Sequence, residues 1–223
     1  MFRALAVAFF ALGANAHAAV LQDVVGQVWK SPGFRINNLT EAFQVVNTTP
    51  LLATWEVSAL DYPRGGINSL RSASSTLANF IGPDTPTLTG NNFFDLQNTA
   101  YIFSGMIRLE DDFEQWSVSS DDGFRLIVDR QIVGQFDGVR TWGTTTGTFS
   151  QRAGLYSFAI VFFERRGDIG IEFTSNGAIV EAGEDPIPDP GEVPIPAAAL
   201  LLPFGLLTVV SARRLKLTGS NDA

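Results

Sequence analysis

Two adjacent aspartates in the segment "SDDG" (120–123) are the residues of this chain whose type and spacing most clearly suggest chemistry. Two carboxylates about 4 Å apart repel each other by about 1 kcal/mol in water and by about 4 kcal/mol at an effective dielectric constant near 20. Asp121 and Asp122 therefore need either open solvent or a cation. The first alternative is a solvated turn, in which one aspartate accepts backbone N–H groups and Gly123 takes a positive φ angle. The second alternative is a metal site.

Three further features could take part in chemistry, and each also has a simpler structural explanation. The segment "LEDDFEQ" (109–115) offers a carboxylate pair like that of a glycosidase, but it falls between two expected strands, where a solvated loop is the simpler interpretation. Glu164 ends a long apolar strand, and we expect it to be a hydrogen-bonded structural carboxylate rather than a catalytic acid. Trp142 could stack on a sugar ring or pack at the end of the domain, and the sequence leaves both open.

The chain has no cysteine and a single histidine, His17, which falls in an expected leader segment. The remaining domain therefore lacks an imidazole base, a thiol nucleophile, the usual zinc ligands and disulfide bonds. Histidine-dependent catalytic triads are excluded, and we expect a protein that is not an enzyme. Without residues 1–18 and 193–223, the net charge changes from −8 to about −11, because four basic residues and one acidic residue are removed. This acidity argues against a nucleic-acid partner and suits cation binding.

Short alternating or apolar runs, separated by turn residues, predict an antiparallel β-sandwich or barrel with one or two short helices. Asn38 is the expected N-cap of one helix, and Ser75 is the expected N-cap of a second helix that stops at Gly82-Pro83. The clearest strand candidates lie in the second half of the chain, at 100–109, 115–120, 123–129, 131–136, 154–164 and 168–175, with earlier ones in 24–29 and 53–63.

The N-terminal segment "MFRALAVAFFALGANAHA" predicts a secretory signal peptide over residues 1–18. Arg3 supplies the positive charge, residues 4–12 are apolar, and small residues precede the expected cleavage after Ala18. A membrane helix that stays attached is the alternative. It is disfavoured because the apolar run has about half of the ~20 residues that a span needs.

The other end of the chain predicts a linker, a membrane helix and a basic tail. Residues 178–192 are acidic and rich in proline, residues 195–212 are uncharged, and Arg213, Arg214 and Lys216 follow. A span over 195–212 would place this basic cluster on the cytoplasmic side. The layout of 193–223 resembles the PEP-CTERM type of sorting signal, with "VPIP" in place of Pro-Glu-Pro. This resemblance implies processing by an exosortase in the inner membrane of a Gram-negative bacterium, and a plain C-terminal anchor is the alternative.

The second half of the chain resembles the anthrax protective-antigen domain family, a β-sandwich module of toxins, glycosidases, bacterial surface proteins and yeast flocculins. The matching motifs are spread over residues 101–173 in the family's order, and the weaker likeness covers 21–176. Arg130 departs from the pattern, because the family usually has glycine at this turn position. The motifs are "FSG" (103–105), "SDDG" (120–123), "VDRQIV" (128–133), "AGLY" (153–156) and "FFERRG" (162–167).

The resemblance implies a protective-antigen-like β-sandwich over residues 19–177 and a calcium-dependent sugar site. In the sugar-binding members, a cis peptide bond joins the paired aspartates, and the calcium ion that they hold also ligates sugar hydroxyls. Asp121 and Asp122 carry over directly as metal and carbohydrate ligands. The other ligands lie in variable loops, where Asp137, together with Asn91 or Asn92, is our choice for the metal. Trp142 is our candidate for stacking on the sugar.

These features together predict an exported protein of the cell surface, outer membrane or exopolysaccharide matrix that binds extracellular polysaccharide or another glycan without catalysis, aided by Ca²⁺. One alternative is a structural matrix protein whose aspartates only shape a loop. Another is an accessory module of glycoside hydrolysis, which is disfavoured because such modules accompany a catalytic domain and the chain leaves no room for one.

Overall fold

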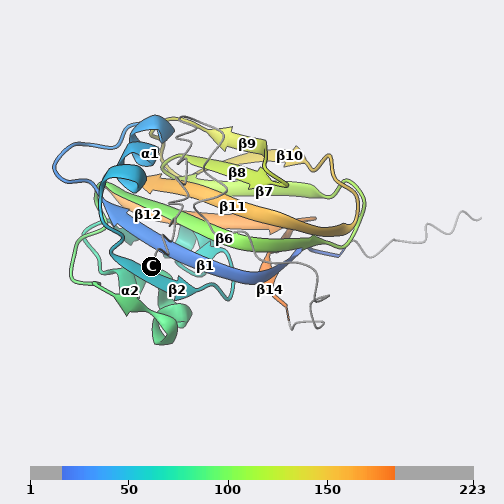
Figure 1. Ribbon diagram of the computed structural model, residues 1–223, viewed down its shortest axis with the longest axis horizontal. Helices are drawn as coiled ribbons and strands as arrows, with labels where there is room; N and C mark the ends of the chain where they lie inside the picture. Colours follow the sequence, from blue (N-terminus) through green and yellow to red (C-terminus); the bar gives the residue numbers. More distant parts are fainter. Residues whose placement is uncertain (1–16, 184–223) are drawn as a thin grey trace, which may run out of the picture.

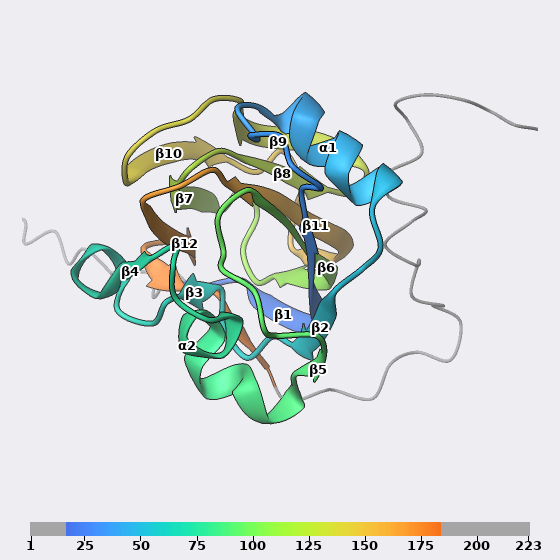
Figure 2. The same ribbon diagram turned by 90° about the vertical axis from the view of Figure 1, so that its left-hand side faces the viewer.

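Alternating apolar side chains close two β-sheets over a shared core in residues 17–183, the part of the chain that the computed structural model describes (Figures 1 and 2). The first sheet has the strand order β5-β2-β1-β6-β11-β8-β9, and β14 pairs in addition with β1. Its strands are β1 (Val20–Lys30), β2 (Ala53–Glu56), β5 (Thr89–Gly90), β6 (Thr99–Leu109), β8 (Phe124–Val128), β9 (Gln131–Phe136), β11 (Gly154–Glu164) and β14 (Glu181–Ala182).

The second sheet has the order β10-β7-β12-β13, and the short strands β3 and β4 also pair with β12. Nearly all pairs in both sheets are antiparallel, and β1 with β14 is parallel. The predicted antiparallel β-sandwich is therefore confirmed. The strands of the second sheet are β3 (Asp61–Tyr62), β4 (Arg71–Ser72), β7 (Gln115–Asp121), β10 (Gly143–Thr148), β12 (Asp168–Ser175) and β13 (Ala178–Ile179).

Aromatic side chains fill the space between the sheets. Phe158 of β11 stacks on Phe173 of β12, with ring centroids 5.8 Å apart, so the two sheets meet through a direct aromatic contact. Tyr101 and Phe162, on neighbouring strands of the first sheet, stack at 5.3 Å. All four side chains are fully buried. Burying large apolar side chains is the main source of stability here, because the chain has no cysteine to form disulfides.

Two short helices, as predicted, complete the domain with two 3₁₀ segments. Helix α1 (Leu39–Thr48) begins where the Asn38 side chain accepts the N–H of Glu41, and it covers the outer face of the first sheet (Figure 2). Helix α2 (Leu77–Ile81) is capped by Thr76 instead of Ser75. The 3₁₀ segments are η1 (Gly66–Ser69) and η2 (Gly82–Thr87).

Two local features differ from the simplest sequence expectations. Strand β10 was not predicted, because its sequence "GTTTGT" carries no apolar alternation. The β8–β9 hairpin turns through Asp129 and Arg130 with φ angles of 51° and 61°. Two consecutive left-handed residues are the signature of a type I′ turn, so Arg130 takes a conformation that favours glycine.

The sandwich also takes in the first residues of the stretch expected to be a linker. Strand β13 pairs with β12, and β14 pairs with the beginning of β1 through Val20 and Glu181. The predicted signal peptide, apart from His17 and Ala18, the rest of the linker and the sorting signal of 193–223 lie outside the described residues. Within residues 17–183, none of the helices combines the length and the apolar character needed to cross a membrane.

Candidate functional site

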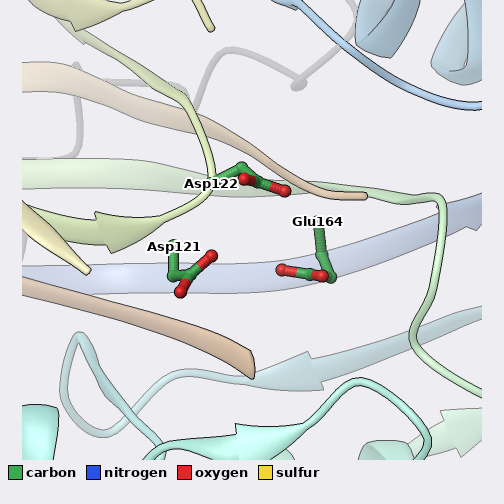
Figure 3. Close-up of side chains that lie close together, drawn as sticks. All are labelled: Asp121, Asp122 and Glu164. Atoms are coloured by element: carbon green, nitrogen blue, oxygen red, sulfur yellow. The ribbon is translucent and has the colours of Figure 1, made fainter. Parts of the chain in front are cut away.

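Three acidic side chains from distant parts of the chain meet at one end of the sandwich. Strand β7 ends at Asp121, β8 begins at Phe124, and β11 ends at Glu164. The pairing of Phe124 with Phe162 brings the end of β11 against the turn between β7 and β8. One carboxylate oxygen each of Asp121, Asp122 and Glu164 lies within 4.8 Å of the others. Figure 3 shows the three carboxyl groups turned toward a common space.

Asp122 is held by the backbone of two loops. Its Oδ1 accepts the N–H of Arg140 at 3.0 Å, and its Oδ2 accepts the N–H of Arg165 at 2.8 Å. The side chain is 1% exposed, and burial raises the pKa of Asp122, whereas these two N–H donors lower it. The Asp121–Asp122 peptide bond is cis, as the resemblance implies. Asp122 is thus built into the fold as a fixed acceptor.

Asp121 is buried with fewer hydrogen bonds. Its side chain is 7% exposed. Burial, followed by repulsion from Asp122 and Asp168, raises the pKa of Asp121 to about 7, and a backbone N–H donor from Trp142 opposes the rise. The nearby Arg140 guanidinium also lowers this pKa, but burial and the two acidic neighbours outweigh it, so an unprotonated Asp121 needs more positive charge beside it.

Glu164 is the residue whose environment differs most from the sequence expectation. It lies at the end of a strand, as expected, but it is fully buried and neither carboxylate oxygen has a hydrogen-bond partner. Burial, and then repulsion from Asp122, Asp121 and Asp168, raises the pKa of Glu164 to about 10. The expectation of a hydrogen-bonded structural carboxylate is wrong, because none of the described residues donates a hydrogen bond to either oxygen. The motif "FFERRG" (162–167) contains Glu164, but it does not indicate that this strand end meets the aspartate pair.

The solvated turn proposed as an alternative for "SDDG" is also wrong in part. Both aspartates are buried, although Asp122 does accept two backbone N–H groups as that alternative required. Gly123 is not among the glycines with positive φ. It is needed for space, because a Cβ atom there would lie 2.5 Å from the Phe163 ring and 2.7 Å from the carbonyl oxygen of Phe136.

The loop between β9 and β10, residues 137–142, closes one side of the three-carboxylate site. Apart from its backbone N–H bond to Asp122, Arg140 reaches back with its guanidinium group to Ser120 and Thr145. The Trp142 ring is half-buried and packs against Gly170, where a Cβ atom would lie 2.7 Å from it. This loop is therefore anchored to β7, β10 and β12.

The other predicted site residues lie outside the three-carboxylate group. Asp137 is exposed and its Oδ1 accepts the N–H of Leu39 at 2.9 Å, so its carboxylate sits at the beginning of α1. Asn91 accepts the N–H of Phe93 at 2.9 Å in the loop before β6, and Asn92 is its half-buried neighbour. The structure thus brings Asp121 and Asp122 together with Glu164, and Trp142 adjoins them through its backbone.

The segment 109–115 has a structural explanation, but it is not simply a solvated loop. Glu114 is 2% exposed and accepts the N–H groups of Glu110 and Asp111 and the hydroxyl of Ser175. The exposed Asp112 accepts the N–H of Ala153 at 2.9 Å. These carboxylates shape the loop at the opposite end of β7 from Asp121.

The donor set of the three-carboxylate site fits a hard divalent cation. Carboxylate oxygens are the ligands that Ca²⁺, Mg²⁺ and Mn²⁺ accept, and Ca²⁺ takes 6–8 oxygens with flexible geometry. A bound cation would neutralise the mutual repulsion of Asp121, Asp122 and Glu164, and it would give the Glu164 oxygens the partner that they lack. Unpartnered buried carboxylates are otherwise expensive, so the residues present fit the ion.

Comparison with known proteins finds the same fold in other chains. No protein-family model matches the sequence, and neither does any curated protein. The fold is similar to the PA14 domain of the MpAFP antifreeze protein, with a TM-score of 0.60 and 20% identity over 75% of this chain and 90% of that chain. It is also similar to a PA14 sugar-binding domain from an RTX adhesin, with a TM-score of 0.56 and 19% identity over 74% of this chain and all of that chain.

A more distant likeness is to the A domain of epithelial adhesin 9 from Candida glabrata, solved in complex with Galβ1-4GlcNAc, with a TM-score of 0.43 and 8% identity over 76% of this chain and 92% of that chain. PA14 is the protective-antigen module that the sequence motifs resemble. The likeness to the two PA14 domains confirms the predicted protective-antigen-like fold.

Proposed function

We propose that this domain is a non-catalytic carbohydrate-binding module that holds Ca²⁺ through Asp121, Asp122 and Glu164. The observation that carries the proposal is the three-carboxylate site itself: its members are at most 7% exposed, and Glu164 has no hydrogen-bond partner for either oxygen. Such an arrangement is unfavourable for a protein that only needs a stable turn, because a buried carboxyl group without a partner costs free energy both when it is charged and when it must take up a proton at neutral pH. It is favourable once a divalent cation is bound.

Two lines of support lead from a cation to a sugar. The PA14-like fold is shared with a domain described as sugar-binding, from an RTX adhesin. The chemistry is also suitable, because a bound Ca²⁺ supplies coordination positions that vicinal sugar hydroxyls can fill in place of water. Asp121 and Asp122 would contact both the ion and the sugar, and the half-buried Trp142 would pack against the sugar ring. Asp137, with Asn91 or Asn92, completes the proposed set only if the loops move toward the ion.

The location that we propose follows from the sequence ends and from the ligand. A signal peptide, an acidic linker and an exosortase-type sorting signal would carry the domain through the inner membrane of a Gram-negative bacterium to the cell surface, outer membrane or matrix. Extracellular polysaccharide or another glycan is the partner available there. An ion site of modest affinity, with a Kd of about 10⁻⁴ to 10⁻³ M as in other extracellular modules, would be filled in such surroundings.

Calcium titration of the metal-depleted protein, followed by melting temperature, tests the ion site. Saturation at about 100 times Kd stabilises a protein by about 2.7 kcal/mol, which is a shift of roughly 5 to 10 °C for a domain of this size. Asp121→Ala should abolish the shift, whereas Asp112→Ala, which alters an exposed carboxylate at the other end of β7, should keep it. A calcium shift that survives Asp121→Ala would place the ion elsewhere, and magnesium serves as the comparison ion.

A glycan array probed with and without calcium tests the ligand. We expect weak binding that disappears in a chelator and with Asp121→Ala. A protein that shows the calcium shift but binds no glycan in any condition would contradict the sugar half of the proposal. It would favour the alternative of a structural matrix protein, which the fixed hydrogen bonds of Asp122 also fit.

A further inference from the structure

A single loop aims two N–H groups at the paired aspartates. The N–H of Arg140 donates to Asp122 Oδ1 at 3.0 Å, and the backbone N–H of Trp142, two residues further on, lies beside Asp121. The orientation of both carboxylates therefore depends on where loop 137–142 lies. A carboxylate that accepts one N–H at a fixed oxygen can offer only its remaining lone pairs to an ion, so the loop decides the geometry of the ligand set.

The Arg140 side chain holds this loop in place with all three of its guanidinium nitrogens. Its Nε donates to the carbonyl oxygen of Ser120 at 3.2 Å, Nη2 donates to the Ser120 hydroxyl at 2.8 Å, and Nη1 donates to Thr145 Oγ1 at 3.1 Å. The group lies over the Phe136 ring, with Cζ 4.4 Å from the ring centroid. The fork is half-buried and fixed on one face by stacking and at its edges by hydrogen bonds.

The Ser120 hydroxyl extends this contact to the aspartates themselves. It accepts Arg140 Nη2–H and donates to the backbone carbonyl of Asp122 at 2.5 Å. Ser120 is fully buried, directly before the aspartate pair. Arg140 therefore touches the "SDDG" turn from two sides: its backbone N–H reaches the Asp122 carboxylate, and its guanidinium reaches the Asp122 backbone through Ser120.

We infer that Arg140 is a positioning residue for the calcium site, and this inference rests on the proposed function. Its guanidinium clamps loop 137–142 to β7 so that Asp121 and Asp122 are oriented before the ion arrives. Charge alone would have the opposite effect, because a cation near two carboxylates repels an incoming Ca²⁺ and competes for their charge. Replacing Arg140 should therefore weaken calcium binding if Arg140 positions the loop, and strengthen it if only its charge matters.

Isothermal calorimetry of calcium binding to the full-length chain separates these roles, with hydrogen exchange of the Arg140 and Trp142 amides in the metal-free protein as a second readout. Arg140→Lys keeps the charge but loses the fork, and Arg140→Met loses both. We expect both variants to weaken calcium binding at least tenfold and to lower the protection of the Trp142 amide. Arg108→Lys, a half-buried arginine at the far end of β6, is the matched control and should change neither quantity.

The possible results decide the matter in distinct ways. Arg140→Lys with wild-type affinity, or Arg140→Met with tighter binding, would show that only the charge matters and would overturn the inference while leaving the ion site intact. Equal weakening by Arg108→Lys would also overturn it, because the cause would be general stability. A wild-type chain that binds no calcium would overturn the proposed function and this inference together.

A milder variant keeps the test available if Arg140→Met does not fold. Thr145→Val removes only the hydroxyl that accepts Nη1–H and leaves Arg140 and its stacking partner in place. We expect this change to weaken calcium binding about threefold. Unchanged affinity and unchanged protection of the Trp142 amide in this variant would count against the clamp.

Discussion

Replacing Glu164 with glutamine should stabilise the metal-free protein and weaken its response to calcium. Burial raises the pKa of Glu164 from 4.5 to about 10, so the folded protein holds a proton there that the unfolded chain has lost at neutral pH. A group with a raised pKa in the folded state contributes full stability below its unfolded pKa, and this contribution is lost as the pH rises toward the folded value. Glu164→Gln removes the titrating group, so the free energy of unfolding no longer falls with rising pH on its account.

The size of the effect follows from the same linkage. Each pH unit between the unfolded and folded pKa values costs about 1.4 kcal/mol for one group. At pH 7, which is 2.5 units above the unfolded value, carboxyl 164 therefore lowers the free energy of unfolding by about 3 kcal/mol. The glutamine amide is also buried without assured partners, so we expect a gain of about 1 to 3 kcal/mol at pH 7 and almost none at pH 4.5.

Urea unfolding at pH 4.5 and pH 7, with a chelator and with calcium, measures this gain. Glu114→Gln is the matched control, because Glu114 is equally buried but its oxygens accept two backbone N–H groups and the hydroxyl of Ser175. We expect this control to destabilise the protein at pH 7 and to leave the calcium response unchanged. Glu164→Gln should instead lose most of the stabilisation by calcium, about 2.7 kcal/mol at 100 times Kd.

The opposite pattern would refute the reasoning. If Glu164→Gln destabilised the chelated protein at pH 7 as much as Glu114→Gln does, carboxyl 164 would have stabilising partners in solution. If it kept the full calcium response, carboxyl 164 would not be a ligand, whatever its contribution to stability.

Three further outcomes follow from the same site. The melting temperature of the metal-free protein should fall as the pH rises from about 4 to 7. The pKa of Asp121, raised to about 7, and the raised pKa of Glu164 both make the folded state bind more protons than the unfolded chain. Calcium should reverse this pH dependence, and a melting temperature that does not change with pH in chelator would contradict the reasoning. Asp122→Ala should lower the free energy of unfolding by about 2 to 5 kcal/mol even in chelator, because it leaves two backbone N–H groups without their acceptor. Asp121→Ala should cost less, because the loss of its contact with the Trp142 N–H is offset by relief of the repulsion between carboxylates; equal losses in urea unfolding would contradict the assignment. Gly123→Ala should cost about 1 to 3 kcal/mol in the same measurement, because the added methyl group would lie 2.5 Å from the Phe163 ring and 2.7 Å from the carbonyl oxygen of Phe136. A neutral result would mean that both the ring and the backbone at Phe136 give way, against this assignment.

Local patterns were sufficient to predict most of the elements. The short apolar or alternating runs at 100–109, 115–120 and 154–164 predicted β6, β7 and β11, because such runs and the turn residues between them are local features of the sequence. Most of β6 and β11 is buried without alternation, because α1 covers the outer face of the sheet. Asn38 predicted the start of α1, because a cap is a contact with the next turn. Strand β10 could not be predicted in this way, because its threonines and glycines follow no apolar pattern and only its pairing with β7 makes it a strand.

Part of the candidate site could likewise be predicted from local sequence, and part depends on the tertiary structure. By itself, the sequence singled out Asp121 and Asp122 as the candidate site, because no histidine or cysteine competes with them in the domain and their adjacency is a local fact. Only the tertiary structure decided that they are buried, that Glu164 joins them, and that Arg140 fastens the loop beside them. The register of β11 against β8 brings Glu164 to the aspartates, and the path of the β9–β10 loop places Arg140 beside them. Pairing between segments that are distant in the chain is fixed by the packing of the whole sandwich, and no short motif carries it.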